Sequence, residues 1–262
     1  MAIPYPHIDP VALQIGPLSI KWYGISYLAA LLIGWYFIKR YNTSPQIAPP
    51  EKIDDAIFWI MLGVIAGGRL GFVVFYQPEL LFSFGLFAIW QGGMSFHGGL
   101  IGVCVAAFMF CRQHNIKFLL LGDLLACVAP IGLFLGRIAN FINGEVYGRP
   151  SDVPWAMVFP QGGPVARHPS QLYEAFLEGI VLFLMLYALR RFFHARQFPG
   201  MLTGFFLIGY GVFRSLAELF RQPDGTIDLF FTEITYGQTL SFPMIIVGII
   251  IIIRAIKRSF AI

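Results

Sequence analysis

The stretch ITYGQTLSFPMIIVGIIIII at residues 234–253 contains no charged side chain. A helix rises about 1.5 Å per residue, so about 20 mostly apolar residues cross the roughly 30 Å of hydrocarbon in a bilayer. This stretch therefore predicts a membrane-spanning helix over residues 237–253. The residues between Lys21 and Lys39 are also free of charge and predict another helix of this kind.

Further apolar stretches lie between these two, although single charged residues interrupt some of them. Only 12% of the 262 residues are charged and 57% are hydrophobic, whereas a soluble domain carries about 25% charged residues. This composition excludes a soluble globular enzyme, a disordered chain and a disulfide-stapled secreted domain. We predict an all-α polytopic membrane protein, a single integral membrane domain over residues 1–262. Its seven predicted transmembrane helices cover residues 20–38, 56–76, 96–111, 118–136, 171–189, 200–217 and 237–253.

The basic residues predict the orientation of these helices. Eleven of the eighteen Lys and Arg residues follow the first, third, fifth and seventh helices. Since basic loops stay on the cytoplasmic side, the N-terminus is expected outside and the C-terminus in the cytoplasm. The net charge of +4 is then explained by topology, and no nucleic-acid partner is needed. Residues 137–170, the longest hydrophilic stretch, are expected to form a small extracytoplasmic head.

Several charged residues lie inside or at the ends of the predicted helices, where each costs about 2.5–3.5 kcal/mol at mid-bilayer. Under this orientation most of them lie on the outer side of the membrane, and Asp123 is the exception. Bases rival acids there, and surplus positive charge favours binding of an anion such as a phospholipid head group. The alternative is that pairs such as Arg214 with Glu218 only hold helices together. The outer residues are Arg69, Arg137, Asn140, Glu174, Glu178, Tyr210, Arg214, Glu218 and Arg221.

Two histidines lie close to this predicted site. His97 is flanked by glycine pairs in GGMSFHGG, residues 92–99, and glycines permit close approach of a ligand to the backbone. His168, in RHPSQ at residues 167–171, is expected to position its loop. The sequence contains no H-E-x-x-H, G-x-S-x-G or P-loop motif, and no obvious nucleophile on the outer side. This absence indicates that the substrate supplies the nucleophile.

The stretch GRIANFINGE at residues 136–145, followed by Gly148, resembles the signature of the phosphatidylglycerol–prolipoprotein diacylglyceryl transferases. The likeness extends over nearly the whole chain. Ala139 departs from the glycine of many members, and residues 149–167 are fewer than in some members. The other similar blocks are residues 22–24, 67–69, 92–99, 167–174 and 210–222.

The resemblance implies seven transmembrane helices and an extracytoplasmic head in the bacterial inner membrane, with the active site toward the periplasm. It implies transfer of the sn-1,2-diacylglyceryl group of phosphatidylglycerol to the lipobox cysteine of a preprolipoprotein signal peptide. This first step of lipoprotein maturation forms a thioether and releases glycerol phosphate. No cofactor or metal is expected.

This chemistry suggests roles for the residues. Arg137 and Arg214 are expected to hold the phosphate, because planar guanidinium groups suit it. His97 is expected to help deprotonate the thiol or to orient the head group, and Glu145 is the alternative base. Residues expected to bind substrate groups are Tyr23, Asn140, Asn143, Glu145, Gly148, Tyr210 and Glu218. Residues expected to support them are Arg69, His168, Glu174 and Arg221.

A different class of function remains open at this point. A lipid transporter or flippase would use the same arginines to hold an anionic head group. Transporters often contain inverted repeats and broken helices at mid-depth. The sequence contains no visible internal repeat, and its charges lie at the outer ends of the helices, which favours the enzyme.

Overall fold

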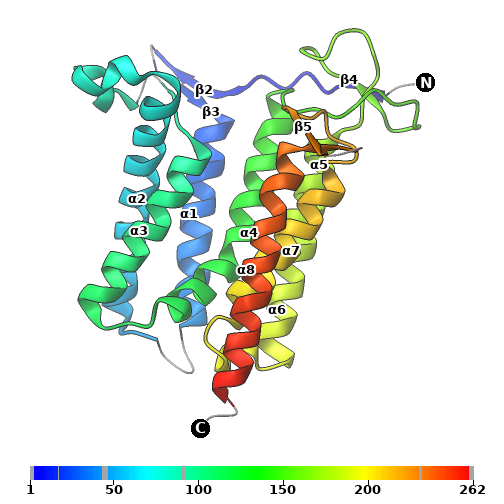
Figure 1. Cartoon of the computed structure of the whole chain (residues 1–262). Coiled ribbons are helices and arrows are strands. Elements are labelled where there is room, and N and C mark those ends of the chain that lie inside the picture. The colour runs from blue at the N-terminus through cyan, green and yellow to red at the C-terminus, as the bar shows by residue number, and fades with distance from the viewer. Residues whose placement is uncertain (1–2, 17, 43–46, 90–91, 230–231, 260–262) are drawn as a thin grey trace. The chain divides into compact units, whose positions relative to one another are not determined.

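A computed structural model describes residues 3–16, 18–42, 47–89, 92–229 and 232–259. Helices dominate the described chain, and each of the seven predicted ranges is mostly helical (Figure 1). The chain divides into two compact units. The first unit comprises Met1–Ile38 with Gly122–Ile262, and the second comprises Lys39–Leu121.

The second unit is a helical hairpin of α2 (Pro50–Tyr76) and α3 (Phe96–His114). Between them lie two 3₁₀ turns, η1 (Pro78–Phe82) and η2 (Phe84–Phe87). Ser95 caps α3, because its side chain accepts a hydrogen bond from the backbone N–H of the third helical residue.

Glycines hold α2 and α3 together at backbone contact. A Cβ added to Gly67 would lie 2.7 Å from the Cα of Gly102, and one added to Gly98 would lie 2.9 Å from the Cα of Gly71. Real Cβ atoms do not approach other atoms this closely, so any larger residue would push the helices apart. Small residues at such spacing are typical of closely packed membrane helices.

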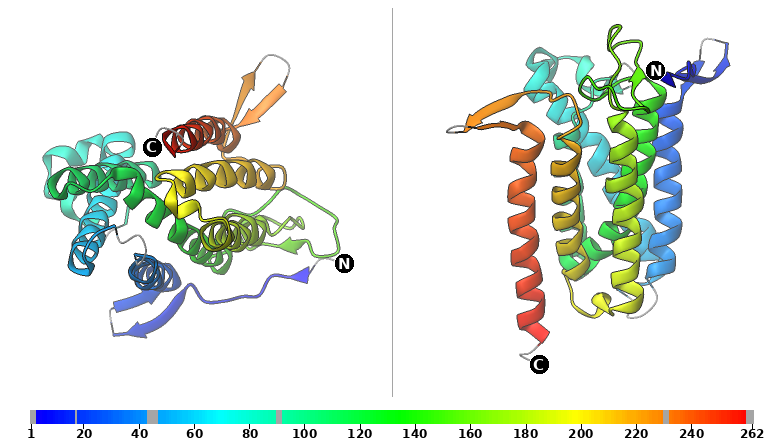
Figure 2. Two further views of the ribbon diagram at one scale, coloured as in Figure 1. Left: turned by 90° about the horizontal axis from the view of Figure 1, so that it is seen from below. Right: turned by 90° about the vertical axis from the view of Figure 1, so that its right-hand side faces the viewer.

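The first unit contains most of α1 (Trp22–Tyr41) and α4 (Phe118–Ile142), together with three further long helical elements. These three are a composite helix, α7 (Met201–Ala217) and α8 (Tyr236–Ser259). The composite helix consists of α5 (Ser170–Glu174), the π-helical segment η4 (Ala175–Val181) and α6 (Leu182–Phe192). The short 3₁₀ turn η5 (Ala195–Gln197) precedes α7. Glycines on α7 and α8 let these two helices pack side by side (Figure 2).

Three two-stranded sheets occupy connections of the first unit, which the all-α prediction did not include. The hairpins β2–β3 and β5–β6 project from the helix ends (Figure 2). Each strand has only two to five residues, too few for hydropathy to reveal. The pairs are β1 (Ile3–Pro4) with β4 (Met157–Val158) in parallel, and, antiparallel, β2 (Val11–Ile15) with β3 (Leu18–Lys21) and β5 (Thr226–Leu229) with β6 (Thr232–Thr235).

Five described helices are long and apolar enough to cross a membrane, and α7 is a shorter apolar helix. The helix α1 is not among the five, because Trp, Tyr, Gly and Ser occupy many of its positions. The chain is thus a mostly helical, polytopic membrane protein. The five helices are Pro50–Tyr76, Phe96–His114, Phe118–Ile142, Ser170–Phe192 and Tyr236–Arg258.

The helix α4 continues to Ile142, six residues beyond the predicted end of its span. Tyr5 stabilises this end, because its hydroxyl donates hydrogen bonds to the carbonyls of Phe141 (2.5 Å) and Ile142 (2.8 Å). Burial raises the pKa of Tyr5, which keeps the hydroxyl protonated. Arg137 and Asn140 therefore project from a continuous helix.

Asp123, the charged residue predicted near the inner end of α4, caps another helix. Its carboxylate accepts hydrogen bonds from the backbone N–H groups of Gly200 and Thr203 and from the Thr203 hydroxyl, each at 2.7 Å. These N–H groups begin α7 and have no partner within that helix. This contact ties α4, which carries Arg137, to α7, which carries Arg214.

Candidate active site

Glu174 is the centre of a buried ion network in the first unit. Its carboxylate lies 2.6 Å from Arg137 Nε, 2.9 Å from Arg214 Nη1 and 3.3 Å from Arg221 Nη1. The side chain has no exposed surface. The structure thus brings together three predicted arginines around one predicted glutamate, from α4, α5, α7 and the segment just after α7.

Three further acids surround the same arginines. Glu178 Oε2 lies 3.4 Å from Arg137 Nη2, and Glu218 pairs with Arg214 one helical turn away. Arg221 Nη2 lies 2.9 Å from Asp224 Oδ2. With Glu174, the cluster therefore contains four acids: Glu174, Glu178, Glu218 and Asp224.

The expected surplus of positive charge is therefore absent from this cluster of described residues. The acids balance the guanidinium groups of Arg137, Arg214 and Arg221. The pairing of Arg214 with Glu218 that the spacing suggested is confirmed. Of the three arginines, Arg137 is the most exposed, with 19% of its side chain accessible against 10% and 8%.

The π-helical segment brings the two central glutamates to the arginines. Glu174 immediately precedes this segment and Glu178 lies within it. Gly179 permits close contact with α4, because a Cβ there would lie 2.6 Å from the Cβ of Phe134. Phe134 lies one turn before Arg137, so this approach sets the distance across which the ion pairs form. Single π turns are frequent at functional sites.

Tyr23, Asn140 and Glu145 form a second predicted group in the same unit. Glu145 Oε1 accepts hydrogen bonds from the Tyr23 hydroxyl (2.8 Å) and from Asn140 Nδ2 (2.9 Å). Asn140 also donates to the Tyr23 hydroxyl. Asn140 lies one turn beyond Arg137 on α4, so this group adjoins the ion network.

Gly148 lies between two backbone segments instead of presenting an open surface. Its N–H donates to the His168 carbonyl at 2.9 Å. A Cβ there would lie 2.6 Å from that oxygen and 2.6 Å from the Phe220 carbonyl oxygen. The position requires glycine because backbone atoms on both sides leave no room.

Replacing Gly148 with alanine is therefore expected to destabilise the protein by about 1–3 kcal/mol, the usual cost of overpacking. The midpoint of thermal unfolding in detergent measures this loss. Gly24→Ala is the control, since a Cβ at Gly24 meets no atom within 4 Å. Equal midpoints for the two variants would contradict the steric account.

Three contacts hold His168 in its loop. Its Nδ1 lies 3.0 Å from the Tyr173 hydroxyl, and its ring packs edge-on against Phe220. Its backbone N–H donates to the Arg149 carbonyl at 3.1 Å. Burial lowers the pKa of the imidazole below its ordinary value.

This shift predicts that stability falls on mild acidification. As the pH drops through about 6.5, the unfolded chain takes up a proton at His168 before the folded protein does. The free energy of unfolding therefore decreases toward lower pH. His168→Gln should lack this contribution, so the midpoint difference from the parent protein should change between pH 7.5 and 5.5. A constant difference would refute the prediction.

Arg69 and His97 belong to the second unit. Arg69 is buried, and its guanidinium donates to the carbonyls of Gly85, Leu86, Gly92 and Gly93 at 2.5–3.1 Å. It thus fixes the connection between α2 and α3. His97 is exposed in the first turn of α3, just after the Ser95 cap.

One known protein family matches most of this chain. The family profile described as prolipoprotein diacylglyceryl transferase matches residues 10–254. The chain belongs to the prolipoprotein diacylglyceryl transferase family. The predicted resemblance is thereby confirmed, and the lipid-transporter alternative is not favoured.

Curated relatives cover nearly the whole transferase. A phosphatidylglycerol–prolipoprotein diacylglyceryl transferase of Rhodospirillum rubrum is 51% identical over 97% of this chain and 94% of its own. One of Paramagnetospirillum magneticum is 50% identical over 98% and 97%. One of Azospirillum brasilense is 49% identical over the full length of both.

Several contacts of this transferase were not predicted from its sequence. Glu178 was predicted on the outer side as a supporting or structural residue, but its ion pair with Arg137 was not predicted, although its i, i+4 spacing from Glu174 was a usable signal. Asp224 and Arg149 carried no such signal, and the Arg149 Nε donates to the Arg221 carbonyl at 3.0 Å.

Tyr210 and Asn143 are the remaining predicted residues. Tyr210 lies one turn before Arg214 on α7, whereas Asn143 follows α4. Among the described residues, no group of three His, Cys, Asp or Glu side chains is arranged as a metal site.

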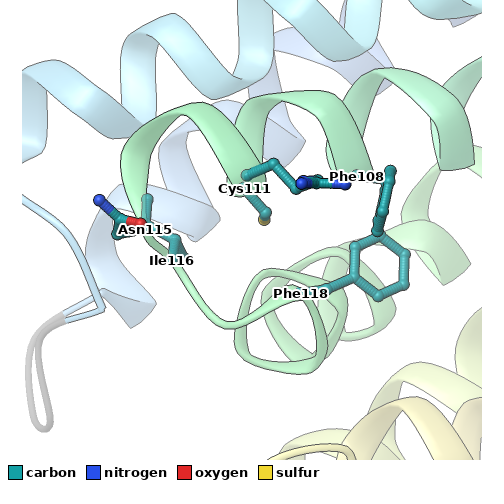
Figure 3. Close-up of a pocket in the computed structure, with 6 residues that line it drawn as sticks. Phe108, Cys111, Asn115, Ile116 and Phe118 are labelled. Atoms are coloured by element: carbon teal, nitrogen blue, oxygen red, sulfur yellow. The ribbon is translucent and has the colours of Figure 1, made fainter.

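A cavity of about 410 Å³ in the second unit contains none of the predicted site residues. Figure 3 shows it at the turn from α3 into α4, with the Phe108 and Phe118 rings on one side. These ring centroids are 6.2 Å apart. The cavity is lined by Phe108, Cys111, Arg112, Asn115, Ile116 and Phe118.

Proposed function

We propose that this chain transfers the sn-1,2-diacylglyceryl group of phosphatidylglycerol to the thiol of a preprolipoprotein lipobox cysteine. The products are a thioether-linked lipoprotein precursor and glycerol phosphate. Family membership over residues 10–254 and relatives of about 50% identity support the reaction. The observation that carries the site is the convergence of Arg137, Glu174 and Arg214 beside Tyr23 and Glu145.

In the proposed step the cysteine sulfur attacks the glyceryl carbon that bears the phosphate. The new C–S bond forms as the C–O bond breaks, and the electron pair leaves with the phosphate oxygen. Arg137 contacts the departing phosphate, because it is the accessible arginine of the network. Arg214 and Arg221 hold Glu174, which in turn orients Arg137. Preorganised donors of this kind act where charge develops in the transition state.

The thiol proton must pass to a base, since the thiolate is the stronger nucleophile. We assign this role to His97, with Glu145 as the alternative. His97 is exposed at the start of α3 and is accessible to a substrate thiol. Glu145 binds Tyr23 and Asn140 through one carboxylate oxygen and retains the other for a substrate group.

We also propose seven transmembrane helices in the bacterial inner membrane, with the site on the periplasmic side. Lysines or arginines occupy the last turns of α1, α3, α6 and α8, as expected for cytoplasmic ends. The ion network instead lies near the end of α4, in the first turns of the composite helix that begins with α5, and at and just after the end of α7. Residues 137–170 then form the extracytoplasmic head, beginning with the last turn of α4.

The test combines purified protein, phosphatidylglycerol in mixed micelles and a lipobox peptide, with the thioether product detected by mass spectrometry. We expect a product carrying one diacylglyceryl group and an equal amount of glycerol phosphate. Peptide that stays unmodified beside an intact lipid pool would refute the proposed reaction. His97→Gln is expected to lower the rate of thioether formation. A parental rate would exclude His97 as the base, and Glu145→Gln would then be expected to lower the rate.

A further inference from the structure

Two polar side chains outside the predicted site hold the loop that carries Glu145. Ser170 and Gln171 open α5, and neither has exposed surface. Gln171 Nε2 donates to the Glu145 carbonyl at 2.6 Å, and Ser170 Oγ donates to the Val146 carbonyl at 3.1 Å. Two consecutive carbonyls of the loop are thus bound by two consecutive side chains of the helix.

The backbone between these contacts is strained. Val146 has φ of 59°, in the left-handed region that β-branched residues rarely occupy. Such a conformation persists only where the surroundings over-determine it. The adjacent backbone supplies further bonds, since Glu145 N–H donates to the Asn140 carbonyl at 3.2 Å and Gly148 N–H to the His168 carbonyl at 2.9 Å.

This loop conformation determines where the Glu145 carboxylate lies. Both Tyr23 and Asn140 donate to Oε1, and within the described part of the chain Oε2 has no hydrogen-bond partner. A neutral amide at Gln171 anchors the backbone without pairing with the carboxylate charge. The Gln171 side chain thus fixes the position of Glu145 and leaves Oε2 free.

The anchor carries a cost in stability. The Oε1 atom of Gln171 is buried and accepts no hydrogen bond in the described residues. Burying an unpaired acceptor is unfavourable, so a side chain present only for packing would be better replaced by an apolar one of similar size. Glu145 itself is partly exposed, so water can approach this loop when the amide is removed.

We propose that Gln171, assisted by Ser170, is a positioning residue of the transfer reaction and acts through Glu145. The proposal rests on the proposed function, because it assigns Glu145 to the substrate. Gln171→Leu removes the amide and keeps the side-chain volume similar. It is expected to lower kcat about 10- to 100-fold, the scale of a small displacement of a reacting group. The KM for phosphatidylglycerol and the unfolding midpoint should stay near those of the parent protein.

Ser170→Ala is the milder second variant and is expected to lower kcat in the same direction. Ser241→Ala is the control, because its hydroxyl is also buried but donates only to the Gly237 carbonyl within α8. This control should retain the parental rate. A parental kcat in Gln171→Leu, or a midpoint fall that accounts for the lost activity, would overturn the proposal.

A double-mutant cycle with Glu145→Gln tests whether Gln171 acts through Glu145. Turnover is followed over long incubations so that slow rates are quantified. Adding Gln171→Leu to Glu145→Gln should change the rate by less than about threefold, because the positioned carboxylate is already gone. Multiplication of the two single effects would mean an independent role and would overturn the proposal.

Hydrogen exchange supplies a readout that does not depend on the reaction. Amides of residues 143–148 should exchange faster in Gln171→Leu than in the parent protein, with residues 96–114 unchanged. Equal exchange of residues 143–148 would overturn the positioning role even if the transfer reaction is confirmed. Failure of the parent protein to form thioether would instead refute the proposed function and leave the exchange result to decide the loop contact.

Discussion

Replacing Arg137 with alanine is expected to lower thioether formation by about 10²- to 10³-fold. The expected scale is that of removing one preorganised donor from a developing oxyanion. The loss should appear mainly in kcat, because the phosphate gains charge as the C–O bond breaks. The micelle assay with a lipobox peptide measures it directly. The protein should remain folded, since Arg214 and Arg221 still pair with Glu174.

Arg137→Lys separates the charge from the shape of the donor. Lysine keeps a positive charge but lacks the planar fork, so its rate should lie between those of the parent protein and Arg137→Ala. Arg258→Ala is the control, because Arg258 is an exposed base in the last turn of α8. A parental rate for Arg137→Ala would exclude Arg137 from the phosphate site.

Replacing Arg214 with methionine is expected to destabilise the protein by about 3–5 kcal/mol, the usual cost of breaking a buried ion pair. Methionine keeps much of the side-chain length but leaves Glu174, Glu178 and Glu218 without the cation that contacts all three. The yield of folded protein in detergent and the midpoint of thermal unfolding should both fall sharply.

A second substitution distinguishes charge from packing. Glu218→Gln removes one of the acids that lose their partner, so the double variant with Arg214→Met should recover part of the midpoint. Removal of charge on both sides of a buried pair is often tolerated far better than removal on one side. No recovery in the double variant would indicate that Arg214 stabilises by packing alone.

The positions of the helices followed from hydropathy because a bilayer demands long apolar segments. The convergence of Arg137, Glu174 and Arg214 was also predictable, since their places at helix ends put them on one side of the membrane. Their charge balance was not predictable. Whether an arginine is free or paired depends on side-chain geometry, and here the acids occupy the guanidinium groups that were expected to be free.

The contacts that hold the end of α4 and the Glu145 loop could not be predicted from the sequence, for a different reason. Tyr5 binds the end of α4 across 136 residues of chain, and no local pattern marks such a pair. The strain at Val146 and the anchoring by Gln171 likewise depend on the path of a loop, which hydropathy does not describe. The place of Glu178 in the ion network was predictable, because a second acid one turn from Glu174 shares its face of the helix.

The π-helical segment Ala175–Val181 also changes the direction in which side chains face along the apolar helix Ser170–Phe192. A π turn accommodates an extra residue relative to an α turn, so the parts before and after it are rotated about the axis by roughly 100° compared with an uninterrupted helix. The half that ends in Arg190 and Arg191 can therefore keep its own apolar face outward. The other half independently directs Glu174 inward. A gain or loss of one residue in this segment would leave the half that follows it in register and turn the glutamate away from its arginines.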